Sequence, residues 1–254
     1  MTDADGRSSQ CSVDGSRRKN CVIFNVVDIK DASSDASVTN QMEGSTRDVE
    51  KIKAVFGSLL EFDVRNHSDP RASEILSVLE QEANESERDI SCLVCWIMTH
   101  GGNGAIKGAD GNEINLNQLP GVLNTSRLKG KPKLFFIQAC QADESETFTR
   151  NWGCYIPTYP DFLFSFATTP GYMAWRSTEK GSIYVEAICN AFEKSFNAVD
   201  KVDVTKVLNN AARQVAIEFE TQSSDAVFTR CKQALCYFST LTQSLYITPP
   251  KQGP

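Results

Sequence analysis

The hydrophobic positions of this chain fall into short, nearly uninterrupted runs that are separated by segments with helical spacing. Short apolar runs bounded by turn residues are typical of strands that are buried on both faces of a sheet. The expected strands are 20–27, 62–65, 90–98, 133–140, 162–167 and, as the last strand, 234–239. Between them, apolar residues recur three and four positions apart, as in amphipathic helices. The expected helices are 46–59, a helix that follows Asp69-Pro70, 116–123, 182–196 and 203–219.

Several polar residues stand where helices are expected to begin. Ser45 and Asp48 have the spacing of a capping box. Asp69 followed by Pro70 predicts an N-cap with proline at the first helical position. Asp203 is a third candidate N-cap. These residues set the expected helix boundaries.

Strands that alternate with helices predict the α/β class, with a mostly parallel sheet covered by helices on both faces. A hairpin is expected over 105–114, where a turn sequence separates two apolar stretches. Segments 28–43 and 143–160 are polar and are expected to be loops. Segment 1–19 is rich in Ser, Asp, Gly, Arg and Lys and is expected to be disordered.

Composition narrows the class of protein. The chain has 254 residues, 41% hydrophobic and 23% charged, which suits one large α/β domain. The net charge of −6 and the absence of a basic stripe argue against nucleic acid as a partner. No apolar run is long enough to cross a bilayer, and the polar start carries no secretion signal, so we expect no membrane association.

Nine cysteines, an odd number scattered through apolar runs, suit reduced thiols and a cytoplasmic location. Cys92 and Cys95 form a C-x-x-C pattern, but within a strand their side chains point to opposite faces. We therefore interpret them as core residues, and we expect neither a metal nor another cofactor.

Candidate chemistry lies at the ends of two predicted strands. His100 follows one of them, and Cys140 ends another. If both strands are parallel, the imidazole and the thiol meet at the same sheet edge, where the imidazole could generate the thiolate. Gly101 allows close backbone approach, so its N–H could face a developing oxyanion. The other histidine, His67, lies in a charged segment and is expected to be exposed and inert.

Several stretches, in the same order along the chain, resemble the caspase family. Gln138-Ala139-Cys140-Gln141-Ala142 is similar to the caspase signature around the nucleophile. The other matching stretches are Thr99-His100-Gly101, Gly130 to Phe135, Thr168 to Ser177, and Gly181-Ser182. The resemblance runs from about Cys21 to about Ile247, so the chain is identified as a caspase-like protein of the short-prodomain type.

The resemblance implies a caspase-like fold with a six-stranded sheet. It divides the caspase-like domain, 20–254, into a large-subunit region over about 20–142, an intersubunit linker over about 143–160, and a small-subunit region over about 161–254. It also implies pairing through the strand at about Ala234–Ser239, with an identical chain or with an active caspase.

The same resemblance implies roles for individual residues. Cys140 would be the nucleophile, His100 the base and acid, and the N–H groups of Gly101 and Cys140 the oxyanion hole. Met173 and Trp175 would form walls of the substrate groove. Caspases cleave protein substrates after Asp in programmed cell death.

In caspases, two arginines and a glutamine hold the aspartate of the substrate. Gln138 and Arg176 match two members of this trio, but Met42 stands where the resemblance requires the other arginine. A thioether cannot pair a carboxylate, so the pocket is expected to be damaged. Arg47 lies nearby but belongs to a predicted helix, so we do not expect it to replace the missing arginine.

Two further positions depart from the caspase pattern. Ala142 replaces a glycine, which costs about 1 kcal/mol if the position requires a positive φ and is otherwise tolerated. The linker offers Asp143 followed by Glu144, a poor cleavage site for a caspase, and its remainder is rich in aromatic residues. We expect the chain to stay in one piece.

Two functions remain open. The chain is either a pseudo-caspase that regulates an active caspase by pairing with it, or an active cysteine endopeptidase that cleaves after Asp. A metacaspase-like preference for Lys or Arg would need an acidic pocket, and Arg176 argues against it.

Overall fold

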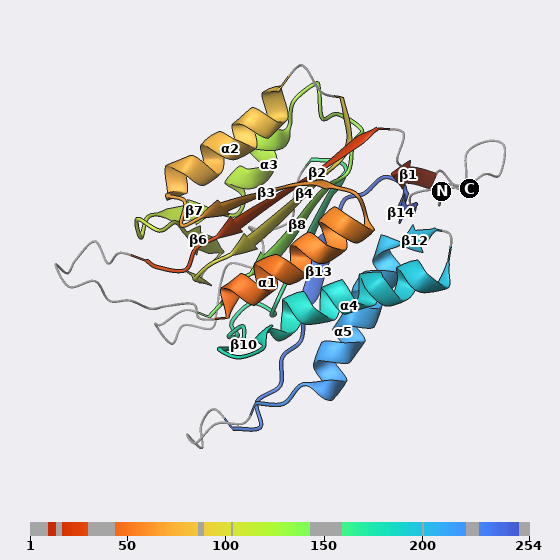
Figure 1. Cartoon of the computed structure of the whole chain (residues 1–254). Coiled ribbons are helices and arrows are strands. Elements are labelled where there is room, and N and C mark those ends of the chain that lie inside the picture. The colour runs from red at the N-terminus through yellow and green to blue at the C-terminus, as the bar shows by residue number, and fades with distance from the viewer. Residues whose placement is uncertain are drawn as a thin grey trace.

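A six-stranded sheet forms the centre of the protein (Figure 1). The computed structural model describes residues 10–13, 17–29, 44–85, 89–102, 104–142, 159–199, 201–221 and 229–248. In spatial order the strands are β13 (Cys236–Ser239), β9 (Phe162–Phe166), β8 (Lys133–Gln138), β4 (Ile90–Met98), β2 (Arg18–Asn25) and β3 (Asp63–Ser68). All neighbouring pairs are parallel except β13 with β9. The predicted α/β fold with a mostly parallel sheet is confirmed.

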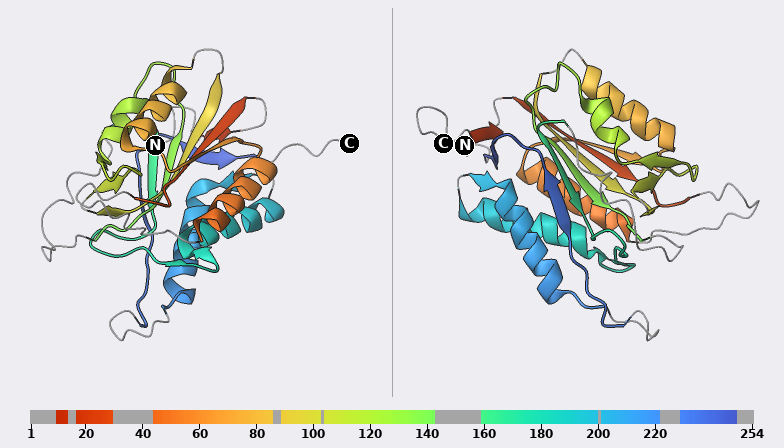
Figure 2. Two further views of the ribbon diagram at one scale, coloured as in Figure 1. Left: turned by 60° about the vertical axis from the view of Figure 1, so that its left-hand side comes forward. Right: turned by 180° about the vertical axis from the view of Figure 1, so that it is seen from behind.

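Helices cover both faces of this sheet (Figures 1 and 2). One face carries α2 (Ala72–Asn84) and α3 (Gln118–Leu123). The other carries α1 (Ser45–Ile52), its π-helical continuation η1 (Lys53–Leu59), α4 (Ile183–Ala198) and α5 (Val204–Glu218). Within the described residues, no helix is long and apolar enough to span a bilayer.

The sheet therefore separates two hydrophobic cores. Cys92 belongs to the core beneath α1, α4 and α5, whereas Cys95 belongs to the core beneath α2 and α3, as the alternation of side chains predicts. In the first core, Trp96 stacks on Phe136 with ring centroids 4.5 Å apart. Phe56 of η1 packs edge-on against both rings. These contacts anchor the helical layer on the sheet.

The expectation of disorder across 1–19 was wrong for residues 10–13, which form β1 (Gln10–Val13), and for Arg18 and Lys19, which begin β2. This strand pairs in parallel with β14 (Ser244–Ile247), which in turn pairs with the short β12 (Val202–Asp203). Strand β13 is accordingly not the last strand of the chain. The composition of β1 is polar, so only its distant partner explains why it is a strand.

Two of the three predicted helix caps were wrong. Helix α1 follows Gly44, whose φ of 84° only glycine adopts easily, and Ser45 and Asp48 do not form a capping box. Helix α2 begins after Arg71, whose backbone N–H donates to the Glu74 carboxylate at 2.7 Å. Asp203 does cap α5, since its carboxylate accepts hydrogen bonds from the first backbone N–H groups.

Short strands complete the edge of the sheet where the parallel strands end. The hairpin expected over 105–114 is present as β6 (Ala105–Lys107) and β7 (Glu113–Asn115), joined by β5 (Gly101–Gly102). A second hairpin consists of β10 (Arg176–Ser177) and β11 (Gly181–Ser182). Both hairpins contain residues of the predicted site.

Candidate active site at the carboxyl edge of the sheet

The register of two neighbouring strands brings His100 and Cys140 to the same level. Strands β4 and β8 are parallel, and Met98 is paired with Gln138. His100 and Cys140 each follow two residues later, so both leave the sheet at its carboxyl edge. The Thr99 N–H donates to the Gln138 carbonyl at 3.1 Å and extends the pairing to this point.

The glycines after His100 lie directly against the segment that carries the thiol. A side chain at Gly101 would place its Cβ 3.1 Å from the Cys140 carbonyl oxygen, and one at Gly102 would lie 2.6 Å from the Ala142 carbonyl oxygen. The contact at Gly102 is closer than a real Cβ tolerates, and a Cβ at Gly101 would also lie 2.7 Å from the Ala105 carbonyl oxygen, so only glycine fits at either position. Ala142 is not among the described non-glycine residues with positive φ, and its replacement of glycine therefore carries no left-handed strain.

The Cys140 thiol is half-buried and lies against the backbone of the loop that leads to β10. The Ala174 N–H donates to the sulfur at 3.4 Å, and the thiol donates to the Ala174 carbonyl at 3.9 Å. Gln141 holds the same loop: its N–H donates to the Tyr172 carbonyl at 3.0 Å, and its carbonyl accepts from Gly171 at 2.9 Å. The loop that resembles the substrate-binding loop of caspases is thus fixed to the segment that carries Cys140.

Gln138 and Arg176 supply buried polar groups close to the thiol. Gln138 is 1% exposed, and the Arg176 side chain is 8% exposed. Within the described part of the chain, the Gln138 side-chain oxygen and all three guanidinium nitrogens of Arg176 have no hydrogen-bond partner. Buried donors and acceptors without partners are costly, so this arrangement is suited to a polar ligand.

Asp48, which the sequence predicted to be part of a helix cap, instead contacts Arg176. Asp48 Oδ2 lies 3.4 Å from Arg176 Nε, and Asp48 Oδ1 accepts the Ser182 N–H at 2.8 Å. Burial raises the pKa of Asp48 to about 6, although the Ser182 hydrogen bond and the Arg176 charge act in the opposite direction. Gly181, with φ of 83°, leaves space for the Asp48 carboxylate, because a Cβ at this position would clash with Asp48 Oδ1.

Gln233 ties Trp175, a predicted wall of the substrate groove, to the sheet. It is 2% exposed, its oxygen accepts the Trp175 N–H at 2.8 Å, and its amide donates to the Ala167 carbonyl at 2.8 Å. Trp175, which lies between Ala174 and Arg176 in the chain, is therefore held in place through its backbone. Met173, the other predicted wall residue, is 46% exposed.

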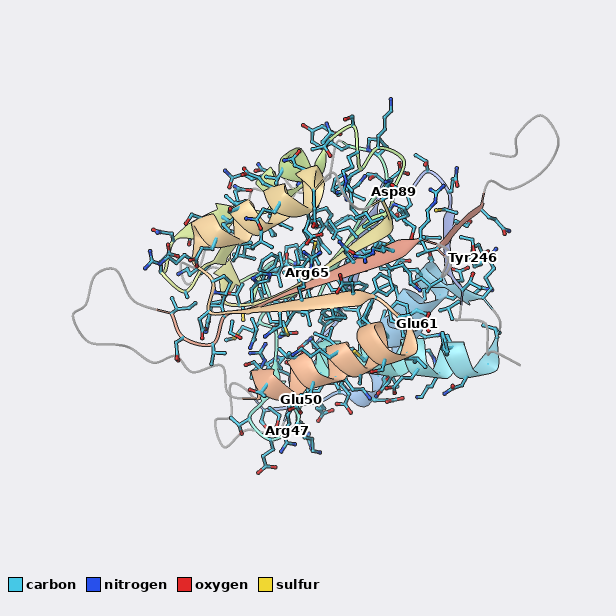
Figure 3. All side chains as sticks on the ribbon, turned by 45° about the horizontal axis from the view of Figure 1, so that its top comes forward. Arg47, Glu50, Glu61, Arg65, Asp89 and Tyr246 are labelled. Carbon is cyan, nitrogen blue, oxygen red and sulfur yellow. The ribbon has the colours of Figure 1, made fainter. Side chains whose placement is uncertain are left out.

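Other predicted residues lie away from the site or outside the described chain. His67 was expected to be exposed, but it is half-buried in β3 and stacks on Phe24 at 5.6 Å. Burial, with help from Arg65, lowers the pKa of His67. Arg47 is exposed on the surface of α1, as expected for a helix residue (Figure 3). Met42 and linker residues 143–158 lie outside the described residues.

Sequence reasoning missed Asp48 and Gln233 as parts of the site. Asp48 stands three residues after a serine near a helix start, a pattern that indicates a cap, and no local signal shows that it is buried. Gln233 follows a lysine in a segment without clear periodicity. Among the described residues, no cluster of His, Cys, Asp and Glu is arranged to hold a metal ion.

Comparisons with known proteins agree with this geometry. Residues 18–246 match the caspase domain. The chain is 31% identical over 243 residues to caspase-7 of Gallus gallus, covering 89% of this chain and 76% of that protein. It is 35% identical over 198 residues to caspase-3 of Oryctolagus cuniculus, covering 74% and 70%. The crystal structure of caspase-1 from Spodoptera frugiperda superposes with a TM-score of 0.82 at 27% identity, covering both chains fully. The chain belongs to the caspase family.

Proposed function

We propose that this chain is a catalytically impaired caspase that regulates an active caspase in programmed cell death by pairing with it in the cytoplasm. The observation that carries the proposal is the state of the aspartate pocket. Its glutamine and one arginine, Gln138 and Arg176, are present, but methionine stands at the position of the other arginine. In addition, Arg176 Nε lies 3.4 Å from Asp48 Oδ2, so this arginine already has a carboxylate neighbour.

The missing arginine has a predictable cost. Losing one partner of a desolvated, hydrogen-bonded charge pair costs on the order of 2–5 kcal/mol in binding or transition-state energy. This corresponds to a loss of roughly 30- to 5,000-fold in rate. A protein with this defect would keep the fold, and therefore the surface for pairing, while it loses most of its turnover.

The edge strand β13 supports pairing as the route of regulation. It lies at one end of the six-stranded sheet, and its outer edge carries no strand within the described chain. Unpaired edges are available for a strand of another molecule. We infer that an identical chain or an active caspase pairs along Cys236–Ser239.

The second candidate is an active cysteine endopeptidase that cleaves after Asp, and the placement of Cys140 and His100 favours it. The thiolate would attack the scissile carbonyl, and the N–H groups of Gly101 and Cys140 would bind the oxyanion. His100 would take the thiol proton and give it to the leaving amine, and water would then hydrolyse the thioester.

Turnover of a fluorogenic peptide ending in Asp separates the two candidates. The purified chain is assayed alone and mixed with an active caspase, with Cys140→Ala as the blank. We expect little Cys140-dependent turnover by the chain alone and a changed rate in the mixture. Robust turnover by the chain alone would refute the proposal that this caspase is catalytically impaired.

Two further measurements locate the defect. Met42→Arg should raise turnover, and a variant that gains nothing would show that the missing arginine is not limiting. Intact mass after expression should give one species. Two fragments that meet within residues 143–161 would contradict the expectation that the linker stays uncut.

A further inference from the structure

A groove lies between strand β3 and helix α2, at the end of the sheet opposite β13 (Figure 1). The β3–α2 groove has a volume of about 520 Å³, and none of the residues that line it belongs to the candidate active site. The strand contributes residues 66–68, and the helix contributes Glu74, Ser77, Val78 and Gln81. These four helix positions have the spacing of a single helix face, so a stripe of α2 lines the groove along its length.

The free edge of β3 borders this groove. Strand β2 pairs with one side of β3, and within the described chain no strand pairs with the other side. The Asp69 N–H donates to the Asn25 carbonyl of β2 at 2.8 Å. Because backbone groups alternate in direction along a strand, the N–H and C=O groups of Asn66 and Ser68 point away from β2. A further strand can therefore pair with them.

The charge of the groove selects the sign of its ligand. Among the described residues that line it, only Glu74 is charged at neutral pH, because burial, with help from Arg65, lowers the pKa of His67 and keeps its imidazole neutral. The Glu74 carboxylate accepts the backbone N–H of Arg71, which itself does not line the groove. Arg65 is already paired with the buried Glu82. The groove therefore favours a cation beside Glu74 and disfavours an anion.

The spacing along α2 matches the repeat of an added strand. Helix α2 runs back along β3, since Arg65 pairs with Glu82 near the end of the helix, and Glu74 therefore lies toward the end of β3. Four helical residues rise about 6 Å. Two strand residues rise about 6.6 Å, so an added strand would place one side chain opposite Glu74 and the next on the same face opposite Val78. Val78 is half-buried and apolar, so it suits an apolar side chain.

We propose that the β3–α2 groove binds an extended segment of a partner protein, which pairs with the free edge of β3 and carries a lysine or arginine opposite Glu74 and an apolar residue opposite Val78. Main-chain hydrogen bonds to Asn66 and Ser68 supply the affinity, and the two side chains supply the specificity. The proposal goes beyond the proposed function, because this surface includes neither Cys140 nor the pairing strand β13.

Two synthetic peptides test the proposal with the unmodified protein. The first is an acetylated threonine-rich amide with a central lysine and a valine two positions away on each side, so that it presents the same pattern in either direction. The second has glutamate in place of the lysine. By fluorescence anisotropy, we expect the lysine peptide to bind with a Kd below about 1 mM. The glutamate peptide should bind at least about threefold more weakly.

Hydrogen exchange measured by mass spectrometry locates the bound peptide. Saturation with the lysine peptide should slow exchange over Asp63–Ser68, because the outward N–H groups of β3 become hydrogen-bonded. Exchange over Cys236–Ser239, at the other end of the sheet, should not change.

Two variants and a matched control identify the groups responsible. Ser68→Pro removes an outward N–H, which an edge strand tolerates, and it should weaken the lysine peptide by about threefold or more. Glu74→Gln keeps an acceptor for the Arg71 N–H but removes the charge, so the affinities of the two peptides should come within about twofold of each other. The control Glu50→Gln removes an exposed carboxylate from α1, on the other face of the sheet, and should leave the preference unchanged (Figure 3). Glu74→Gln tests the proposal even if Ser68→Pro folds poorly.

Five results would overturn the proposal. They are no saturable binding of the lysine peptide at millimolar concentration, tighter binding of the glutamate peptide, slowed exchange along β13 in place of β3, and an unchanged preference in folded Glu74→Gln. The fifth is a peptide-free dimer that Ser68→Pro dissociates in analytical ultracentrifugation, since a second copy of the chain would then occupy the edge. None of these measurements depends on turnover, so a failure here is distinguishable from a failure of the proposed function.

Discussion

Asp48 should make the stability of this protein fall as the pH rises, and Asp48→Asn should remove that dependence. Burial raises the pKa of Asp48 from 3.8 to about 6, while the Ser182 N–H and Arg176 offset only part of the shift. The folded protein thus holds this proton more tightly than the unfolded chain does. The free energy of unfolding therefore declines as the pH rises from about 4 to above 6, and an asparagine cannot contribute to this decline.

The size of the effect follows from the two pKa values. Each pKa unit between the folded and unfolded states corresponds to about 1.4 kcal/mol, so the full penalty at neutral pH is about 3 kcal/mol. Part of it develops below pH 4.5. Between pH 4.5 and 7.5, the difference in unfolding free energy between variant and wild type should therefore move in favour of the variant by about 2 kcal/mol.

Urea unfolding of both proteins at pH 4.5, 6.0 and 7.5, with a reductant present, measures this difference. Asp110→Asn is the control, because the stability that Asp110 contributes should depend on pH in the opposite direction. Burial alone would raise the pKa of Asp110, but hydrogen bonds from the Ala72 N–H and the Asn112 side chain outweigh it, so the pKa is lowered. The stabilisation from Asp110 should therefore be lost as the pH falls. A difference for Asp48→Asn that stays constant within about 0.5 kcal/mol would refute the burial argument.

Two further substitutions test the supports of the site. Phe56→Ala should destabilise the fold by about 3–5 kcal/mol. It should also weaken the near-ultraviolet circular dichroism of Trp96, because Phe56 packs on the Trp96 ring. The control Phe238→Ala, on the far side of the sheet, should leave the Trp96 signal intact. Gln233→Leu should remove the hydrogen bonds that Gln233 makes to the Trp175 N–H and the Ala167 carbonyl, and it should destabilise the fold by roughly 2 kcal/mol or more. Hydrogen exchange at the Trp175 amide should become faster. Exchange that stays slow would contradict the role of Gln233 in holding Trp175.

The sequence was a good guide where structure depends on local pattern. The apolar run 90–98 predicted β4 with its observed ends, since a strand buried on both faces needs bulky side chains at every position. The same reasoning located β8. Once these strands are parallel neighbours, their register alone brings His100 and Cys140 to one edge. The shared position of Cys140 and His100 could therefore be predicted from the sequence.

The sequence was a poor guide where a residue's role depends on a distant partner. Asp48 has the local pattern of a helix cap, but it accepts a hydrogen bond from Ser182, 134 positions away. Strand β1 is short and polar, and its pairing with β14 joins segments more than 230 positions apart. Neither feature leaves a periodic signal, because burial and pairing arise only after the sheet has formed.

These two kinds of dependence separate the placement of His100 and Cys140 from the charge around Arg176. Backbone pairing between β4 and β8 positions His100 and Cys140, and this pairing tolerates most side-chain changes elsewhere. The charge around Arg176 instead depends on single side chains, since Asp48 of α1 is the carboxylate that contacts this arginine of β10. If the proposed function is right, Met42→Arg should therefore recover recognition of Asp without altering the geometry of the thiol. If recognition returns but turnover does not, the contact between Cys140 and Ala174 is the next barrier, since the loop backbone then covers the sulfur that must attack.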